Sequence, residues 1–309
     1  MIEKIKSGDR RSIARAITYV ESESLESEKL LDELFHLTGK AYRIGITGPP
    51  GSGKSTLTNA LAKYYRKSDL KVGIIAVDPT SPFTGGALLG DRVRMTDLGL
   101  DQGVFIRSMA TRGSLGGLSK KANEAADVLD AAGFDIIILE TVGVGQSELD
   151  IAKTADTTIV VVVPESGDSI QAMKAGLMEI ADFYVVNKAD RPGSEQSVSA
   201  IKTMLQYRSH DESTFMPNVV KTVATENKGI NEVAIEIQKH KEHQISHGKF
   251  HNKRISRIKE KIKEITEFKL CNLLWSSNNN AFMSEELNSP YQVSEKILED
   301  FKMNLTKRS

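Results

Sequence analysis

A glycine-rich segment that ends in a lysine is the clearest candidate for chemistry in this chain. It follows an apolar run and precedes a helix-forming stretch, and it matches the pattern G-x-x-x-x-G-K-[ST] in full. Glycines let backbone N–H groups turn inward around a phosphate, at a helix N-terminus whose dipole favours anions. The segment therefore predicts a nucleotide phosphate site, in which Lys54 neutralises phosphate charge and the Ser55 hydroxyl ligates Mg²⁺. Its residues are Gly48, Pro49, Pro50, Gly51, Ser52, Gly53, Lys54, Ser55 and Thr56.

A second candidate site directly follows the predicted strand that ends at residue 186, at the same end of the sheet. Asn187, Lys188 and Asp190 form an Asn-Lys-x-Asp motif. The Asp190 carboxylate can accept hydrogen bonds from N1–H and the exocyclic amine of guanine, whereas N1 of adenine is itself an acceptor. Asn187 supports the loop and can reach N7, and the Lys188 stem can cover the base. The motif predicts a preference for guanine, with the base O6 covered by the backbone of Thr222, Val223 and Ala224.

Two further strand ends carry acids suited to a metal ion. Residues 136–139 lead into Glu140, and Gly143 follows three positions later, where its N–H can donate to a γ-phosphate. Glu140 is therefore expected to ligate Mg²⁺, directly or through water. Asp78 and Asp91 are further candidates for the metal, although Asp91 fits a helix N-cap equally well. The predicted catalytic set is Lys54, Asp91, Glu140 and Gly143.

The residue after Gly143 bears on the rate of hydrolysis. It is Val144, where Ras-type GTPases carry a glutamine that orients the attacking water. Gln146 stands two residues further on, and its position does not make it equivalent. Slow intrinsic hydrolysis is therefore expected, which a partner or a second subunit must complete.

Short β-branched runs alternate with helical stretches between residues 42 and 240. Near-continuous apolar strands separated by helices are typical of a parallel sheet covered on both faces. The predicted fold class is therefore α/β, with a doubly wound, mostly parallel sheet of the P-loop NTPase type. The predicted strands are residues 43–47, 72–77, 136–139, 157–163, 184–186 and 219–223.

Helical segments are expected on either side of this domain. Apolar residues recur at spacings of three and four near the N-terminus, which predicts a helical arm over residues 1–40 before a GTPase domain at 41–240. A C-terminal helical extension is predicted over 241–309, with its last helix at about 294–305. Its stripe of isoleucines fits a dimer contact and packing against the arm equally well. The stripe is Ile255, Ile258, Ile262 and Ile265.

The composition narrows the remaining function classes. Forty-one basic residues balance forty-one acidic residues, so no global charge attracts nucleic acid or an anionic membrane. Cys271 is the single cysteine, which excludes an internal disulfide and fits a reducing compartment. No apolar run approaches the ~20 residues that span a bilayer, and the first residues do not resemble a targeting peptide. We expect a cytoplasmic protein that binds neither nucleic acid nor membrane.

Taken in order, the motifs resemble the MeaB/ArgK family of SIMIBI-class GTPases. The most discriminating stretch is 140–148, because it begins with Glu where most GTPases carry Asp. The resemblance implies a homodimeric chaperone that binds GTP or GDP with Mg²⁺ and docks on an adenosylcobalamin-dependent acyl-CoA mutase, usually methylmalonyl-CoA mutase. There it would gate cofactor loading and protect the mutase. The matching segments are residues 8–11, 14–17, 48–56, 78–79, 89–91, 113–117, 140–148 and 187–190.

Two other functions compete with this interpretation. A nickel-delivery GTPase of the same class would carry His runs or paired Cys, whereas this chain has six scattered histidines and one cysteine. An ATP-dependent kinase would have to bind adenine tightly, which the expected role of Asp190 opposes.

Overall fold

The structure is a computed structural model that describes residues 1–79, 96–111, 117–141, 147–164, 177–207, 211, 214–276 and 289–306. The chain forms two compact units, Met1–Arg254 and Ile255–Ser309. The three-part division expected from the sequence, at 1–40, 41–240 and 241–309, stays a prediction.

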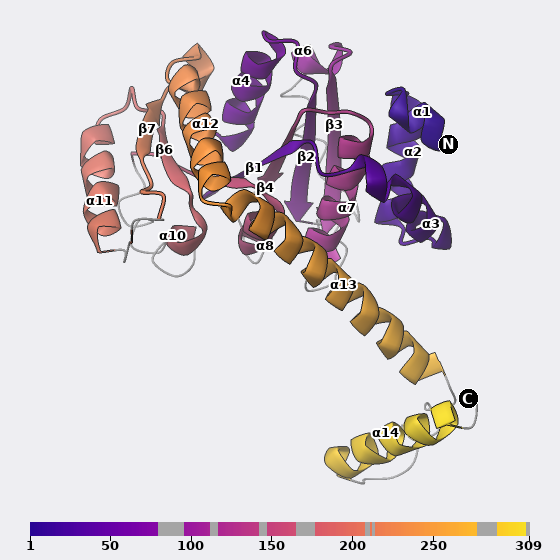
Figure 1. The fold of residues 1–309 in the computed structure, drawn as a ribbon. Coiled ribbons are helices and arrows are strands. Elements are labelled where there is room, and N and C mark those ends of the chain that lie inside the picture. The colour runs from indigo at the N-terminus through magenta and orange to yellow at the C-terminus, as the bar shows by residue number, and fades with distance from the viewer. Residues whose placement is uncertain are drawn as a thin grey trace. The chain divides into compact units, whose positions relative to one another are not determined.

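Within the described residues, seven parallel strands form one sheet in the larger unit, in the order β3-β2-β4-β1-β5-β6-β7 (Figure 1). β1, β4, β5 and β6 are buried along their whole length, which explains their near-continuous apolar sequences. The predicted α/β class with a doubly wound sheet is therefore confirmed. The strands are β1 (Tyr42–Thr47), β2 (Val72–Pro79), β3 (Val104–Thr111), β4 (Ile136–Thr141), β5 (Thr157–Val162), β6 (Phe183–Asn187) and β7 (Val219–Thr222).

Helices cover both faces of this sheet. Because successive strand residues point to opposite faces, the buried clusters separate the two layers. One layer comprises α1 (Ile2–Lys6), α2 (Arg10–Glu21), α3 (Leu25–Leu34), α7 (Gly117–Ala131), α8 (Ser147–Thr154) and α11 (Ser194–Gln206). The other layer comprises α4 (Lys54–Arg66) and α12 (Ile230–Ser246). The short helices are η1 (Phe35–Leu37), α6 (Thr96–Gly99), α10 (Leu177–Ile180) and η3 (Ala224–Glu226).

The predicted N-terminal helices are present and belong to the core of the larger unit. Ile13 and Ile17 of α2 are fully buried, in one cluster with α7 and the sheet. Polar contacts fix the same helix to strand β3, since Arg107 forms an ion pair with Glu21. The helical spacing of apolar residues in this region thus reflects packing against the domain.

One strand, β3, is absent from the sequence prediction. It is the outermost strand of the sheet, next to β2. Its buried residues Phe105 and Met109 are separated by the polar residues Arg107 and Ser108. The continuous apolar run that marks the central strands is therefore missing. The bounds of the other six strands differ from the prediction by one or two residues.

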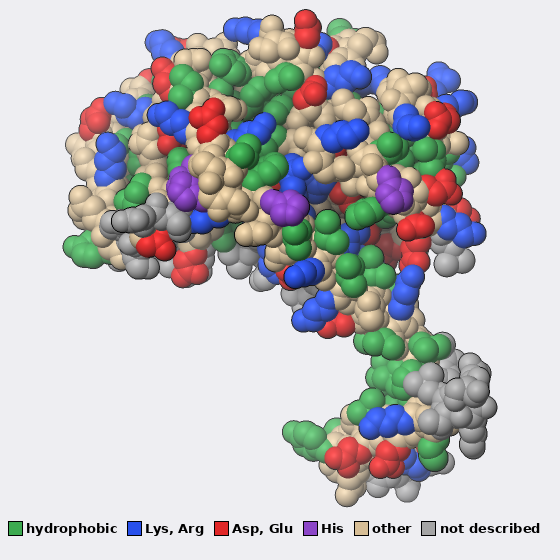
Figure 2. Space-filling model, viewed as in Figure 1, with side chains coloured by type: hydrophobic (Ala, Val, Ile, Leu, Met, Phe, Trp, Pro, Cys, Tyr) green, Lys and Arg blue, Asp and Glu red, His purple; other side chains and the backbone are tan. Residues whose placement is uncertain are grey.

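The smaller unit is helical, as expected. Helix α13 (Lys249–Ser276) belongs to this unit from Ile255 onwards. Helix α14 (Pro290–Thr306) belongs to it entirely and begins before the predicted residue 294. Apolar side chains lie at its surface (Figure 2), including Ile258 at 42% and Ile262 at 58% exposure. Among the described helices, none has the length and apolar character needed to cross a membrane.

Candidate nucleotide-binding site

The glycine-rich loop connects β1 to α4, in the strand-to-helix context that the sequence predicts. Gly48 and Gly53 have φ angles of 135° and 88°, in the left-handed region that favours glycine. A Cβ at Gly53 would lie 2.2 Å from Asn187 Nδ2, and one at Gly48 would lie 2.1 Å from Val161 O. Close packing and backbone conformation therefore both require glycine here. Helix α4 begins at Lys54, which places its N-terminus at the end of the loop.

Lys54 lies within this loop and is only 6% exposed. Its Nζ donates to Gly48 O at 2.7 Å and to Pro49 O at 2.9 Å. The ammonium group is thus held against the inner carbonyls of the loop, beside the positive end of the α4 dipole. This arrangement concentrates positive charge where the loop could enclose an anion.

Asn187, at the end of β6, joins the phosphate loop to the end of β7. Its Nδ2 donates to Ser52 O at 2.8 Å, and its Oδ1 accepts from Thr222 Oγ1 at 3.0 Å and from Ala224 N at 3.2 Å. Both ends of the amide are therefore engaged by the protein. The predicted supporting role of Asn187 has a defined geometry, and the second N–H of Nδ2 could still donate to N7 of a base.

Lys188 continues the same connection. It has a positive φ of 56°, which is uncommon for a residue with a side chain, and its Nζ donates to Gly51 O at 2.8 Å. Asn187 and Lys188, two neighbouring residues of one motif, thus donate hydrogen bonds to two successive carbonyls of the phosphate loop.

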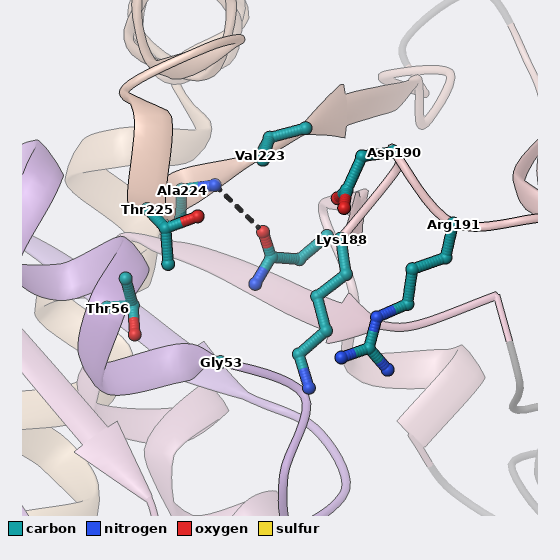
Figure 3. A pocket seen from close by; sticks show the side chains of 9 residues that line it. Gly53, Thr56, Lys188, Asp190, Arg191, Val223, Ala224 and Thr225 are labelled. Carbon is teal, nitrogen blue, oxygen red and sulfur yellow. Dashed lines mark hydrogen bonds between the residues drawn. The ribbon is translucent and has the colours of Figure 1, made fainter.

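A pocket opens between this motif, the start of α4 and the segment after β7 (Figure 3). The exposed Asp190 side chain lies at the pocket beside Lys188, and Val223 and Ala224 face them from the other side. Thr222 is buried and bonds to Asn187 instead of lining the pocket. The lining residues are Gly53, Thr56, Asn187, Lys188, Asp190, Arg191, Val223, Ala224 and Thr225.

Arg191 and Thr225 are lining residues that the sequence prediction does not include. Each directly follows a predicted residue, Asp190 or Ala224. Extending each motif by one position would have found them.

The second half of the site lies at the end of β4. Glu140 is 3% exposed, and its Oε1 accepts a hydrogen bond of 2.5 Å from Ser55 Oγ, in the first turn of α4. β4 pairs with β1 in the register Ile46↔Glu140, so the backbone of Glu140 lies beside β1 two residues before the phosphate loop begins at Gly48.

This pair of oxygens fits a magnesium site. Mg²⁺ in nucleotide enzymes is bound by one or two protein oxygens together with substrate phosphates, and Ser55 and Glu140 supply one hydroxyl and one carboxylate. Across the described part of the chain, no three His, Cys, Asp or Glu side chains gather in a way that could hold a metal by themselves. A metal at this position would therefore complete its ligands with phosphate and water.

Three predicted site positions cannot be placed in this way. Asp78 belongs to β2, but its side chain lies outside the described part of the structure. Asp91 and Gly143 lie outside the described residues, as do Val144 and Gln146.

Comparison with known proteins adds the family. Residues 13–279 match the family model described as methylmalonyl Co-A mutase-associated GTPase MeaB. The chain belongs to the MeaB family. A putative GTPase of Pyrococcus abyssi is 55% identical over 267 residues, which cover 86% of this chain and 82% of that protein. The Escherichia coli GTPase ArgK is 37% identical over 90% of this chain and 86% of its own length.

A solved structure supports the same assignment at the level of the whole fold. The crystal structure of a LAO/AO transport system kinase superposes with a TM-score of 0.75 at 29% identity, covering 97% of this chain and 96% of that one. The resemblance inferred from the motifs is thus confirmed. As a MeaB family GTPase, the chain has guanine nucleotides as its ligand class, and the pocket at Asp190 is the candidate site for the base.

Proposed function

We propose that this chain is a GTP-hydrolysing chaperone that gates cofactor loading and protection of an adenosylcobalamin-dependent acyl-CoA mutase, with methylmalonyl-CoA mutase as the first candidate. The carrying observation is the bridge made by Asn187, which joins the phosphate loop to the segment that lines the base pocket. A base and a phosphate chain bound across that bridge would belong to one nucleotide. The name of the matching family supports the mutase as partner.

In this proposal the base is read by Asp190 and the phosphates are held by the loop. Asp190 accepts from N1–H and the exocyclic amine of guanine, and Lys188 covers the base with its stem. Lys54 turns from the loop carbonyls to the phosphates, since phosphate is a stronger acceptor for an ammonium group than a neutral carbonyl. The specificity for guanine over adenine then rests on one carboxylate.

Hydrolysis in this proposal depends on the pair Ser55 and Glu140. Mg²⁺, when bound, would offset the charge that develops on the phosphates. Ser55 and Glu140, which are hydrogen-bonded to each other in this structure, would hold it, the hydroxyl directly and the carboxylate directly or through water. Because Val144 replaces the water-orienting glutamine of Ras-type GTPases, we expect the intrinsic rate to be slow.

Coupling to the mutase supplies the missing activation. If the GTP form binds the mutase more tightly than the GDP form, the mutase must favour GTP over GDP by the same factor. The chain would act as a homodimer, and the apolar residues exposed on α13 are candidates for the contact between subunits.

The test measures steady-state GTP hydrolysis with and without methylmalonyl-CoA mutase from the same organism. We expect the mutase to raise the rate at least about 10-fold, and its affinity to differ between GDP and a non-hydrolysable GTP analogue. The Lys54→Ala variant serves as the control for contaminating activity, because it should not respond to the mutase. Unchanged rates together with equal affinities in both nucleotide states would reject the mutase as partner.

A further inference from the structure

The last two residues of β4, Glu140 and Thr141, form side-chain hydrogen bonds with the phosphate-loop segment at residues 47–55. One bond lies on each face of the sheet. On the face covered by α4, Glu140 accepts from Ser55 at 2.5 Å. On the opposite face, Thr141 Oγ1 donates to Thr47 Oγ1 at 2.9 Å. Thr47 is the last residue of β1 before the loop, and Thr141 is the last residue of β4. Two consecutive residues at the end of β4 thus form hydrogen bonds, on opposite faces of the sheet, with residues at the two ends of the phosphate-loop segment.

The burial pattern confirms that these two contacts lie on different faces. Ile138, two residues before Glu140, belongs to the cluster that includes α4. Leu139, two residues before Thr141, belongs to the cluster on the other face. Gly45 lies two residues before Thr47 in β1, so both residues point to the same face of the sheet. A Cβ at Gly45 would lie 2.5 Å from the Ile151 side chain of α8. The threonine pair therefore lies on the α8 side of the sheet.

The hydroxyl contact extends the pairing of β1 and β4 beyond their ladder. The register between these strands ends at Ile46↔Glu140, so Thr47 and Thr141 stand one residue further along. Both are buried, at 0% and 1% exposure. A hydrogen bond between two buried hydroxyls restricts rotation of both strand ends, because each loses a partner if either turns away.

We propose that Thr141 is a positioning residue for the GTPase reaction, which acts through Thr47 to hold Glu140 in register with Ser55. The inference rests on the proposed function, because it assigns Glu140 and Ser55 to the metal. A Glu side chain has one more rotatable bond than Asp, so its carboxylate needs a fixed backbone to remain within 2.5 Å of a hydroxyl. The threonine bond supplies that fixation from the face that the carboxylate does not reach.

A purely structural role would have a different signature. Thr→Val keeps the shape and removes the hydroxyl, so a single substitution leaves one buried hydroxyl without its partner. Replacing both threonines by valine removes both polar groups and can restore stability. If the bond serves only stability, the double variant should regain turnover together with its thermal midpoint. If the bond positions Glu140, turnover should stay low after stability returns.

The experiment compares the full-length chain with Thr141→Val, Thr47→Val and the double variant. Measurements are kcat and KM for GTP across a Mg²⁺ titration, GDP affinity, and thermal unfolding without nucleotide. We expect each single variant to lose ~10-fold to ~100-fold in kcat, as for other residues that orient a metal ligand. GDP affinity should change by no more than about twofold, because base and loop contacts remain. The double variant should unfold near the wild-type temperature and still hydrolyse GTP slowly.

Two controls separate the hydroxyl from its surroundings. Thr141→Ser retains the donor, so its kcat should stay within about threefold of wild type. Thr158→Val removes a hydroxyl that is equally buried in β5 but has no hydrogen-bond partner in the described residues, so it should leave kcat unchanged. Thr47→Val breaks the same bond from the other side, which keeps the test valid if Thr141→Val does not fold.

The outcomes are distinct. Recovery of kcat in the double variant, or an unchanged kcat in both single variants, overturns the positioning role while wild-type hydrolysis leaves the proposed function intact. A wild-type chain that does not hydrolyse GTP overturns the proposed function, and this inference with it.

Discussion

The parallel strands of the central sheet have a carboxyl edge, formed by their C-terminal ends, and an opposite edge, formed by their N-terminal ends. Polar side chains have different kinds of partner at these two edges. At the carboxyl edge, Asn187 and Lys188 donate to backbone carbonyls of a loop more than a hundred residues away in sequence, and a pocket opens beside them. At the opposite edge, charged groups pair with each other. Arg43 donates to Asp127 at 2.7 Å and lies 3.8 Å from Asp130.

The opposite edge also fixes the chain where it enters the sheet. The Asp130 carboxylate accepts from the backbone N–H groups of Gly39, Lys40 and Ala41 at 2.8 to 3.1 Å. Burial of Arg43 lowers the pKa of its guanidinium, but the nearby carboxylates of Asp127, Asp156 and Asp130 outweigh this effect and raise the pKa above its ordinary value. This cluster satisfies a buried charge and anchors the start of β1.

A hydrogen-bonded chain completes that edge. His240 Nδ1 lies 2.8 Å from Thr157 Oγ1, which lies 2.6 Å from the Tyr42 hydroxyl. On the other side of the ring, His240 Nε2 lies 3.3 Å from Asp182. These contacts dock α12 against the first residues of β1 and β5.

Buried polar groups therefore do not by themselves mark a functional site in this sheet. At the opposite edge they hold strands and helices together. At the carboxyl edge they shape a loop and leave neighbouring groups directed at a pocket. Substitutions at the carboxyl edge should therefore alter ligand binding more than stability, and those at the opposite edge should do the reverse.

The largest effect is expected for Lys54→Ala at the carboxyl edge. Removing one partner of a buried charge pair costs about 4 kcal/mol, so GTP affinity should fall roughly 1,000-fold. Thermal unfolding without nucleotide should shift by only about 3 °C, because the lysine is not part of the apolar core. The control is Lys63→Ala on the same helix, which loses only a surface ion pair with Asp97. An unchanged GTP affinity in Lys54→Ala would contradict the assignment of the loop.

The next effect is expected at the opposite edge, for Arg43→Met. The variant leaves Asp127 and Asp130 without their guanidinium partner, so the free energy of unfolding should fall by about 3 kcal/mol. GTP affinity of the folded variant should match wild type. Urea unfolding and a GTP titration would measure both quantities, and Lys221→Met, which breaks an exposed pair with Glu195, is the matched control. If the free energy of GTP binding changes by more than the free energy of unfolding, the proposed difference between the two edges is contradicted.

The smallest effect concerns pH and His240. Burial lowers the pKa of His240 from its ordinary value of 6.5, against the attraction of Asp182, while Lys253 and His243 lower it further and Asp156 raises it. The neutral ring therefore belongs to the folded state, and its contribution is complete above pH 6.5. It is lost as the pH falls from 6.5 towards the lowered pKa. The difference in stability between wild type and His240→Gln should shrink over that range, and a pH-independent difference would show that His240 does not titrate as described.

The sequence predicts the carboxyl edge better than the opposite one. A phosphate loop and an Asn-Lys-x-Asp motif use contiguous residues whose order is dictated by one ligand, so both are visible without a structure. The cluster of Arg43 with Asp127 and Asp130 joins residues more than eighty positions apart, and nothing local distinguishes them from surface charges. Strand β3 is missing from the prediction for a different and local reason, because polar residues interrupt its apolar run.

Two details of the site depend on the three-dimensional structure and not on any local sequence pattern. The sequence indicates that Asn187 supports a loop, but the simultaneous contacts with Ser52 and Ala224 follow only from the approach of three strand ends. Glu140 was identified from its place after a strand, whereas its direct contact with Ser55 depends on the register of β1 and β4.

The most direct test of a guanine site at the carboxyl edge is the nucleotide preference of Asp190→Asn. Xanthine carries a carbonyl where guanine carries its amine, so the new amide can donate to it while still accepting from N1–H. Titration of GTP and XTP into wild type and variant, with Asp97→Asn as the surface control, gives the four affinities required. Wild type should prefer GTP by at least roughly 100-fold, and the variant should prefer XTP. A variant that keeps the wild-type preference for GTP would contradict the claim that Asp190 reads the base.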